Sequence, residues 1–119
     1  MIKLNLKRKF VLAIAALTIS FSVSKAQDGL YPFEEKGKYG YINQSGKVMI
    51  TGQYSFADQF YDGLAVVKEK GKKGYIDKSG KMVIAAQYDE AYKFKEGMAV
   101  VKIEGKWKYI DKTGKVLIE

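Results

Sequence analysis

The side chains best suited to chemistry in this sequence are carboxylates and aromatic rings, because histidine and cysteine are absent. Without them the chain lacks the commonest general base, a thiol nucleophile and the usual zinc ligands. Ser45, Ser79 and Thr113 recur just before glycines. Turn formation explains these hydroxyls better than nucleophilic catalysis. We therefore expect no catalytic residues, no metal ligands and no cofactor.

Paired carboxylates are the remaining catalytic option, since two of them at a suitable separation can hydrolyse a glycoside. Asp77 and Asp111 lie at equivalent turn positions, and Asp62 and Glu96 each precede a glycine. A catalytic pair usually needs two unlike environments, whereas these carboxylates repeat in like ones. The pattern favours a structural role, and we expect the chain not to be an enzyme.

Aromatic residues are abundant, and they divide into a recurring and a variable set. The recurring set is predicted to form the core and comprises Tyr41, Tyr75, Tyr109, Tyr54, Tyr88, Phe60 and Phe94. Tyr39, Tyr61, Tyr92 and Trp107 occupy variable or unmatched positions. These four are the predicted binding residues, because exposed aromatic rings stack on sugars or anchor partner chains.

These residues are positioned by a repeat of 34 residues. The segments GKYGYINQSGKVMI (37–50), GKKGYIDKSGKMVI (71–84) and GKWKYIDKTGKVLI (105–118) begin at that interval. Residues 37–70 and 71–104 are identical at 18 of 34 positions. We divide the chain into units 29–62, 63–96 and an incomplete 97–119, and a fixed period of this length indicates an array.

Each unit reads as a three-stranded antiparallel meander. In the middle unit, β-branched and alternating runs predict strands at 64–69, 73–77 and 81–84. Lys70-Gly71 gives a tight turn, and Asp77-Lys78-Ser79-Gly80 suits a type I turn closed by a glycine bulge. Residues 85–97 lack alternation and are expected to connect the units through a turn or one helical turn. The fold class is all-β, with units stacked because one meander cannot bury both of its faces.

The first 26 residues have the order of a secretory signal peptide. A basic start is followed by a 14-residue apolar run (10–23) and by Ser24-Lys25-Ala26. The run is too short to span a bilayer, which takes about 20 apolar residues. We expect cleavage after Ala26, no stable membrane insertion afterwards, and a periplasmic or extracellular location.

The basic character of the chain comes largely from this segment. Five of the 21 basic residues and none of the 13 acidic ones precede residue 27, so the remainder carries a net charge of +3. The only arginine of the whole sequence, Arg8, also lies among the first 26 residues. Arginine supplies the planar fork used in phosphate and guanine recognition, so nucleic acid is not an expected partner.

Residues 71–102, GKKGYIDKSGKMVIAAQYDEAYKFKEGMAVVK, closely resemble the WG repeat family, also called KWG repeats. The resemblance extends over residues 28–119. The eponymous Trp-Gly pair appears as Tyr39-Gly40, Lys73-Gly74 and Trp107-Lys108, so no unit keeps it intact. The resemblance implies a β-repeat array in a mostly bacterial family without an assigned activity, and it provides no catalytic set to transfer.

Three hypotheses for the function follow. The first is a non-enzymatic exported module that contacts a protein or an envelope polymer through its variable aromatics. The second is a carbohydrate-binding or glycan-processing protein that uses the same aromatics and carboxylates. The third is self-association, because residues 115–118 would leave an open strand edge at the end of the array.

Overall fold

The computed structural model describes residues 29–118 of the chain. The predicted signal peptide, residues 1–26, lies outside the described residues, and so does residue 119. Between residues 29 and 118 every regular element is a β-strand. The described part contains no helix long and apolar enough to cross a membrane.

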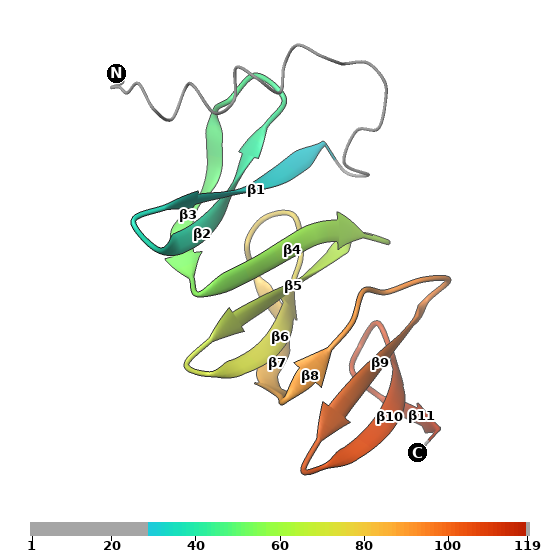
Figure 1. The fold of residues 1–119 in the computed structure, drawn as a ribbon. Coiled ribbons are helices and arrows are strands. Elements are labelled where there is room, and N and C mark those ends of the chain that lie inside the picture. The colour runs from blue at the N-terminus through green and yellow to red at the C-terminus, as the bar shows by residue number, and fades with distance from the viewer. Residues whose placement is uncertain (1–28, 119) are drawn as a thin grey trace.

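The strands form three antiparallel sheets that follow one another along the chain (Figure 1). Sheet A consists of β1 (Leu30–Glu35), β2 (Lys38–Asn43) and β3 (Val48–Tyr54). Sheet B consists of β4 (Phe56–Tyr61), β5 (Leu64–Glu69), β6 (Lys72–Ile76) and β7 (Met82–Tyr88). Sheet C consists of β8 (Glu90–Ala91), β9 (Met98–Ile103), β10 (Lys106–Asp111) and β11 (Val116–Ile118). The predicted all-β fold of stacked meanders is confirmed.

The segment between meanders differs from the expected turn or helical turn, because it also contributes a strand. In residues 85–97, β7 continues to Tyr88 and β8 then pairs with β9. The equivalent segment of the preceding unit forms β4, which pairs with β5. An edge strand leaves backbone donors and acceptors unpaired, and a connector that runs alongside satisfies them. Each connector therefore begins the next sheet.

The tight turns owe their form to a residue pair with positive φ. Lys70 has φ 53° and Gly71 has φ 82°, as a type I′ turn requires at both central positions. The same combination recurs at Lys36-Gly37, Asp62-Gly63, Glu96-Gly97 and Glu104-Gly105. The backbone twist of such a turn matches the twist of paired strands, so the hairpin register is fixed locally.

The longer turns are closed by a side chain at their first residue. Asp77 Oδ1 accepts hydrogen bonds from the backbone N–H of Ser79 and of Lys81, both at 3.0 Å. Gly80 N–H donates to the Asp77 carbonyl at 3.0 Å, and Gly80 has φ 90°. Asn43 and Asp111 act in the same way in the other two units. The prediction of a glycine-closed turn at each place is confirmed.

Two apolar clusters fill the junctions between neighbouring sheets. The junction between sheets A and B contains Leu30, Tyr41, Ile50, Tyr54, Ala57, Phe60, Ala65, Val67 and Ile76. The junction between sheets B and C contains Leu64, Val66, Tyr75, Ile84, Tyr88, Ala91, Phe94, Ala99, Val101 and Ile110. Most members of the two clusters are equivalent residues 34 positions apart. The core therefore lies between units rather than within them.

A tyrosine and a phenylalanine meet in each junction. The ring centroids of Tyr41 and Phe60 are 4.9 Å apart, and those of Tyr75 and Phe94 are 4.8 Å apart, both edge to face. The Tyr41 hydroxyl donates to the Asp58 carbonyl at 2.6 Å. The Tyr75 hydroxyl donates to the Tyr92 carbonyl at 2.7 Å. One tyrosine thus covers apolar surface and also holds the connector to the next sheet.

The paired strands β6 and β7 approach each other unusually closely at Gly74. A Cβ atom at Gly74 would lie 2.6 Å from the Ile84 carbonyl oxygen, and one at Gly40 would lie 2.3 Å from the Ile50 oxygen. Any side chain there would collide with backbone. Lys108 occupies the equivalent position in sheet C, where the paired strand β11 is only three residues long.

Gly74→Ala should therefore lower the free energy of unfolding by at least about 2 kcal/mol, because the strands must move apart to admit a methyl group. Urea unfolding followed by circular dichroism measures the change. Gly52→Ala is the matched control, since the nearest atom to a Cβ at Gly52 is 3.4 Å away. The control should stay within about 0.5 kcal/mol of the parent chain. Equal losses of unfolding free energy in the two variants would contradict the close approach of β6 and β7 at Gly74.

Candidate functional site

Two of the four predicted binding residues, Tyr92 and Trp107, lie together on sheet C. Their ring centroids are 6.0 Å apart, with an interplanar angle of 20°. The exposed fractions of the two side chains are 53% and 48%. Tyr92 follows β8 and is held by a hydrogen bond from its backbone N–H to the Val100 carbonyl at 3.0 Å. Trp107 on β10 is the register partner of Lys102, whose Nζ lies 5.4 Å from the centre of the Trp107 ring system.

The other two predicted residues lie elsewhere and are half-buried. Tyr39 on β2 contacts Phe56, with ring centroids 6.3 Å apart. Tyr61 ends β4, and the Lys93 ammonium sits 4.5 Å from its ring centroid. The structure therefore does not bring the four aromatics to one place. Only Tyr92 and Trp107 can contact the same ligand as a pair.

The two exposed rings belong to a larger apolar surface, which we call the free face of sheet C. It consists of Tyr92, Met98, Trp107, Tyr109 and Ile118, whose exposed fractions range from 42% to 61%. In the preceding units the equivalents of Met98, Tyr109 and Ile118 are Leu64, Tyr75 and Ile84, and then Leu30, Tyr41 and Ile50. Those six side chains are no more than 8% exposed. Within residues 29–118 the free face is thus a junction surface that no sheet covers.

The prediction that Tyr109 is a core residue was wrong. Its exposed fraction is 42%, against 0% for both Tyr41 and Tyr75. The equivalents are buried because the next sheet covers them, and no described sheet follows sheet C. Met98 and Ile118 are also exposed, which was not predicted from the sequence. Their place in the last of the three described sheets was the signal that could have identified all three.

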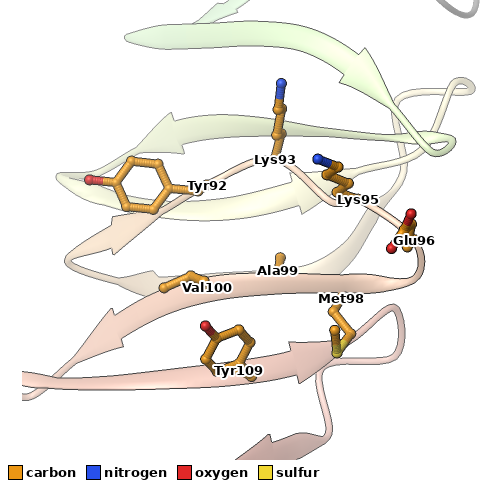
Figure 2. Close-up of a pocket in the computed structure, with 8 residues that line it drawn as sticks. All are labelled: Tyr92, Lys93, Lys95, Glu96, Met98, Ala99, Val100 and Tyr109. Carbon is orange, nitrogen blue, oxygen red and sulfur yellow. The ribbon is translucent and has the colours of Figure 1, made fainter.

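An open pocket of about 310 Å³ lies at the edge of this face. Figure 2 shows Lys93 and Lys95 on the connector, Met98 and Val100 on β9, and Tyr109 on β10. Two lysines and Glu96 thus border a floor of apolar and aromatic side chains. An apolar centre with a charged rim is the usual anatomy of a protein-binding surface.

The variable repeat position occupied by Tyr39, Lys73 and Trp107 changes the contact made with the next connector. Tyr39 meets Phe56 through the ring contact, whereas Lys73 meets Glu90, the equivalent of Phe56, in an ion pair at 3.4 Å. The Lys73 ammonium also lies 5.3 Å from the Phe56 ring centroid. Tyr39 and Lys73 therefore join neighbouring units by different chemistry at the same place in the repeat, while Trp107 stays largely exposed.

The repeated aspartates have the structural role predicted for them. Hydrogen bonds from the Ser79 hydroxyl at 2.7 Å and from the Lys81 backbone N–H hold the pKa of the Asp77 carboxyl below its usual value. Thr113 and Lys115 do the same to the pKa of Asp111. A carboxylate kept ionised by three donors within its own turn is poorly suited to protonate a leaving group.

Two further aspartates, Asp62 and Asp89, make polar contacts with other segments of the chain. Asp62 Oδ2 accepts a hydrogen bond from the Gly97 N–H at 2.9 Å, and its Oδ1 lies 3.8 Å from Lys112 Nζ. The hydrogen bond and charge of Lys72 lower the pKa of Asp89. Over residues 29–118, no three acidic side chains converge in a way that could hold a metal ion.

The junction tyrosines are held in their neutral form. Burial raises the pKa of the Tyr41 and Tyr75 phenols well above the usual range. Burial also raises the pKa of Tyr54 and Tyr88, which are exposed by only 3% and 4%. Because ionised phenols cannot be accommodated there, the junctions depend on these hydroxyls staying protonated.

Comparison with known proteins identifies the repeat itself. Residues 39–72 and 74–107 each match the family model described as WG containing repeat. The two matches are tandem and cover more than half of the chain. No curated protein and no solved structure shows a significant match to the chain.

Tyr75→Phe should lower the free energy of unfolding at neutral pH by about 1 kcal/mol, through loss of the hydrogen bond to the connector. Above pH of about 10, where unfolded tyrosines ionise, the parent chain should lose stability because its buried phenols resist ionisation. Tyr75→Phe removes one such group, so its stability should fall less steeply with rising pH. Chemical unfolding at a series of pH values measures both effects.

Tyr109→Phe is the matched control for this variant. Its hydroxyl donates no hydrogen bond within residues 29–118, and its ring is largely exposed. The control should stay within about 0.5 kcal/mol of the parent chain at neutral pH. Equal effects of the two variants would contradict the role given to the junction tyrosines.

Proposed function

Because this chain belongs to the family of proteins with WG containing repeats, we propose that it is a non-enzymatic, exported interaction module. Its binding surface is the free face of sheet C, and its partner is another protein or an envelope component. The observation that carries this proposal is the exposure of Met98, Tyr109 and Ile118, whose repeat equivalents are buried. A contiguous apolar surface of this kind usually marks an interaction site.

The composition of the free face supports protein binding. Tyrosine and tryptophan are enriched among residues that dominate binding energy, because they bury a large area and lose few rotatable bonds. Tyr92 and Trp107 are already stacked before any partner arrives. Lys95, Lys102 and Glu96 lie around the apolar residues and favour a partner with charged residues at its rim.

The state of the carboxylates supports a role without catalysis. The pKa values of Asp77, Asp89 and Asp111 are lowered, whereas a general acid needs a raised one. Asp77 and Asp111 repeat one turn geometry, so they do not form the unlike pair that glycoside hydrolysis requires. The export component of the proposal rests on the basic and apolar segments that precede residue 27.

Carbohydrate binding is the second candidate function. The nearly parallel rings of Tyr92 and Trp107 are the specific observation in its favour, because a flat aromatic surface can stack on a sugar ring. In this case the free face would take an envelope polysaccharide instead of a protein.

Trp107→Ala should reduce capture of the protein partner at least tenfold, since a central aromatic contributes more than about 1.4 kcal/mol to binding. The measurement is retention of envelope proteins on the immobilised full chain across a concentration series, with a glycan array run in parallel. Phe56→Ala is the matched control, because it removes an aromatic side chain that is 38% exposed but lies on sheet B. Saturable binding of a sugar that is lost in Trp107→Ala would contradict protein binding and support the second candidate.

A further inference from the structure

The two junctions inside the molecule show what kind of surface covers a face like the free face of sheet C. At each junction the covering sheet presents an alanine, a valine and an isoleucine: Ala65, Val67 and Ile76 on sheet B, then Ala99, Val101 and Ile110 on sheet C. All six are at most 3% exposed. A turn glycine completes the cover, since Gly80 lies against Ile50 and Gly114 against Ile84.

The phenylalanine of the connector fills the space beside the alanine. Phe60 on β4 is the register partner of Ala65 on β5, and both belong to the apolar cluster between sheets A and B. The small alanine leaves room for the ring, which then meets Tyr41. Phe94 and Ala99 occupy the equivalent positions in the junction between sheets B and C. Each junction therefore needs one aromatic ring at this place.

Sheet A carries a related surface on the side that faces away from sheet B, which we call the outer face of sheet A. Its residues are Tyr31, Phe33, Ile42 and Gly46, the repeat equivalents of the alanine, valine, isoleucine and glycine above. Tyr31 and Ile42 are register partners on β1 and β2, and Tyr31, Phe33 and Ile42 are half-buried. This face thus retains the isoleucine and the glycine of a covering surface.

The outer face of sheet A carries an aromatic ring where the other sheets have an alanine. The repeat equivalent of Phe60 and Phe94 is Ala26, and the equivalent of Ala65 and Ala99 is Tyr31. In sheet A the strand position that holds a small alanine in sheets B and C carries an aromatic ring instead. Phe60 and Ala65 are cross-strand neighbours in sheet B. A ring at Tyr31, the repeat equivalent of Ala65, therefore reaches the region of sheet A that corresponds to the one Phe60 fills in sheet B.

We propose that the free face of sheet C binds the outer face of sheet A of a second copy of this chain, so that copies stack head to tail. The proposal rests on the interaction role given above and names the partner. Tyr31 of one copy takes the place of the connector phenylalanine against Tyr109 of the next. Charged side chains of both signs border the two faces, with Lys95, Lys102 and Glu96 beside the free face and Glu35 and its register partner Lys38 beside the outer face.

A head-to-tail contact is heterologous, so it propagates into an open filament or closes into a ring. It differs from strand pairing at the edge of β11, which would join two copies through like surfaces. The edge of β11 offers three residues for backbone pairing. The free face offers five large side chains with water on one side. Burial of those side chains is the larger source of binding free energy.

Self-association should be measured on the full chain, expressed in a bacterium so that N-terminal processing can occur and be checked by mass spectrometry. Sedimentation velocity from about 5 µM to about 1 mM covers the affinities expected of a small interface. The expected result is an average mass that rises steadily with concentration. Met98→Glu on the free face and Tyr31→Glu on the outer face should each weaken self-association at least tenfold, because each places an unpaired charge in the contact.

Val83→Glu is the matched control, since Val83 is 40% exposed on β7 of the middle sheet and belongs to neither face. It should associate as the parent chain does. Thermal unfolding of every variant separates a lost contact from a lost fold. If Tyr31→Glu fails to fold, Phe33→Glu replaces it on the same face.

The decisive measurement mixes the two defective variants. Met98→Glu retains an intact outer face and Tyr31→Glu retains an intact free face, so a mixture should form a dimer with one copy of each and stop there. A parent chain that is monomeric up to 1 mM would overturn the proposal, and so would a Tyr31→Glu variant that still dimerises with itself. If the chain is monomeric but still captures an envelope protein through Trp107, the interaction role stands and the second copy is the wrong partner.

Discussion

A sheet of three or four short strands cannot bury both of its faces, and every other feature of this chain depends on how that constraint is met. Neighbouring sheets cover each other's faces, and a buried tyrosine lies in each junction between them. Its ring packs against a phenylalanine from the connector, and its hydroxyl bonds to a connector carbonyl. The stacking of sheets in Figure 1 follows from two such contacts, each with the same geometry.

The same constraint accounts for the candidate binding surface. Sheet B has a neighbour on each side, whereas the described part of the chain places no sheet beyond sheet C. The face that would be a junction is therefore turned to water, with Tyr109 and Met98 both 42% exposed. The proposed interaction role needs no site beyond this exposed sheet face.

Local rules made much of the fold predictable from the sequence. Glycines at fixed intervals, each after a residue suited to a turn, predicted the hairpins, and alternating apolar residues predicted the strands of each meander. The connectors were not predictable, because residues 85–97 carry no alternation and become strand only through pairing with β9. Of the candidate site, the exposure of Tyr92 and Trp107 was predicted, but their contact was not, since Tyr92 lies on the connector after β8 and Trp107 lies on β10, 15 positions further along.

The sequence by itself determined the repeat, the turn geometry and the residue type at each position of the unit. The tertiary structure alone decided which of those positions are buried. Tyr41, Tyr75 and Tyr109 share one residue type and one place in the repeat, yet the first two are fully buried and the third is 42% exposed. The physical reason is that burial in an array belongs to a pair of neighbouring units, so a residue's own segment cannot specify it.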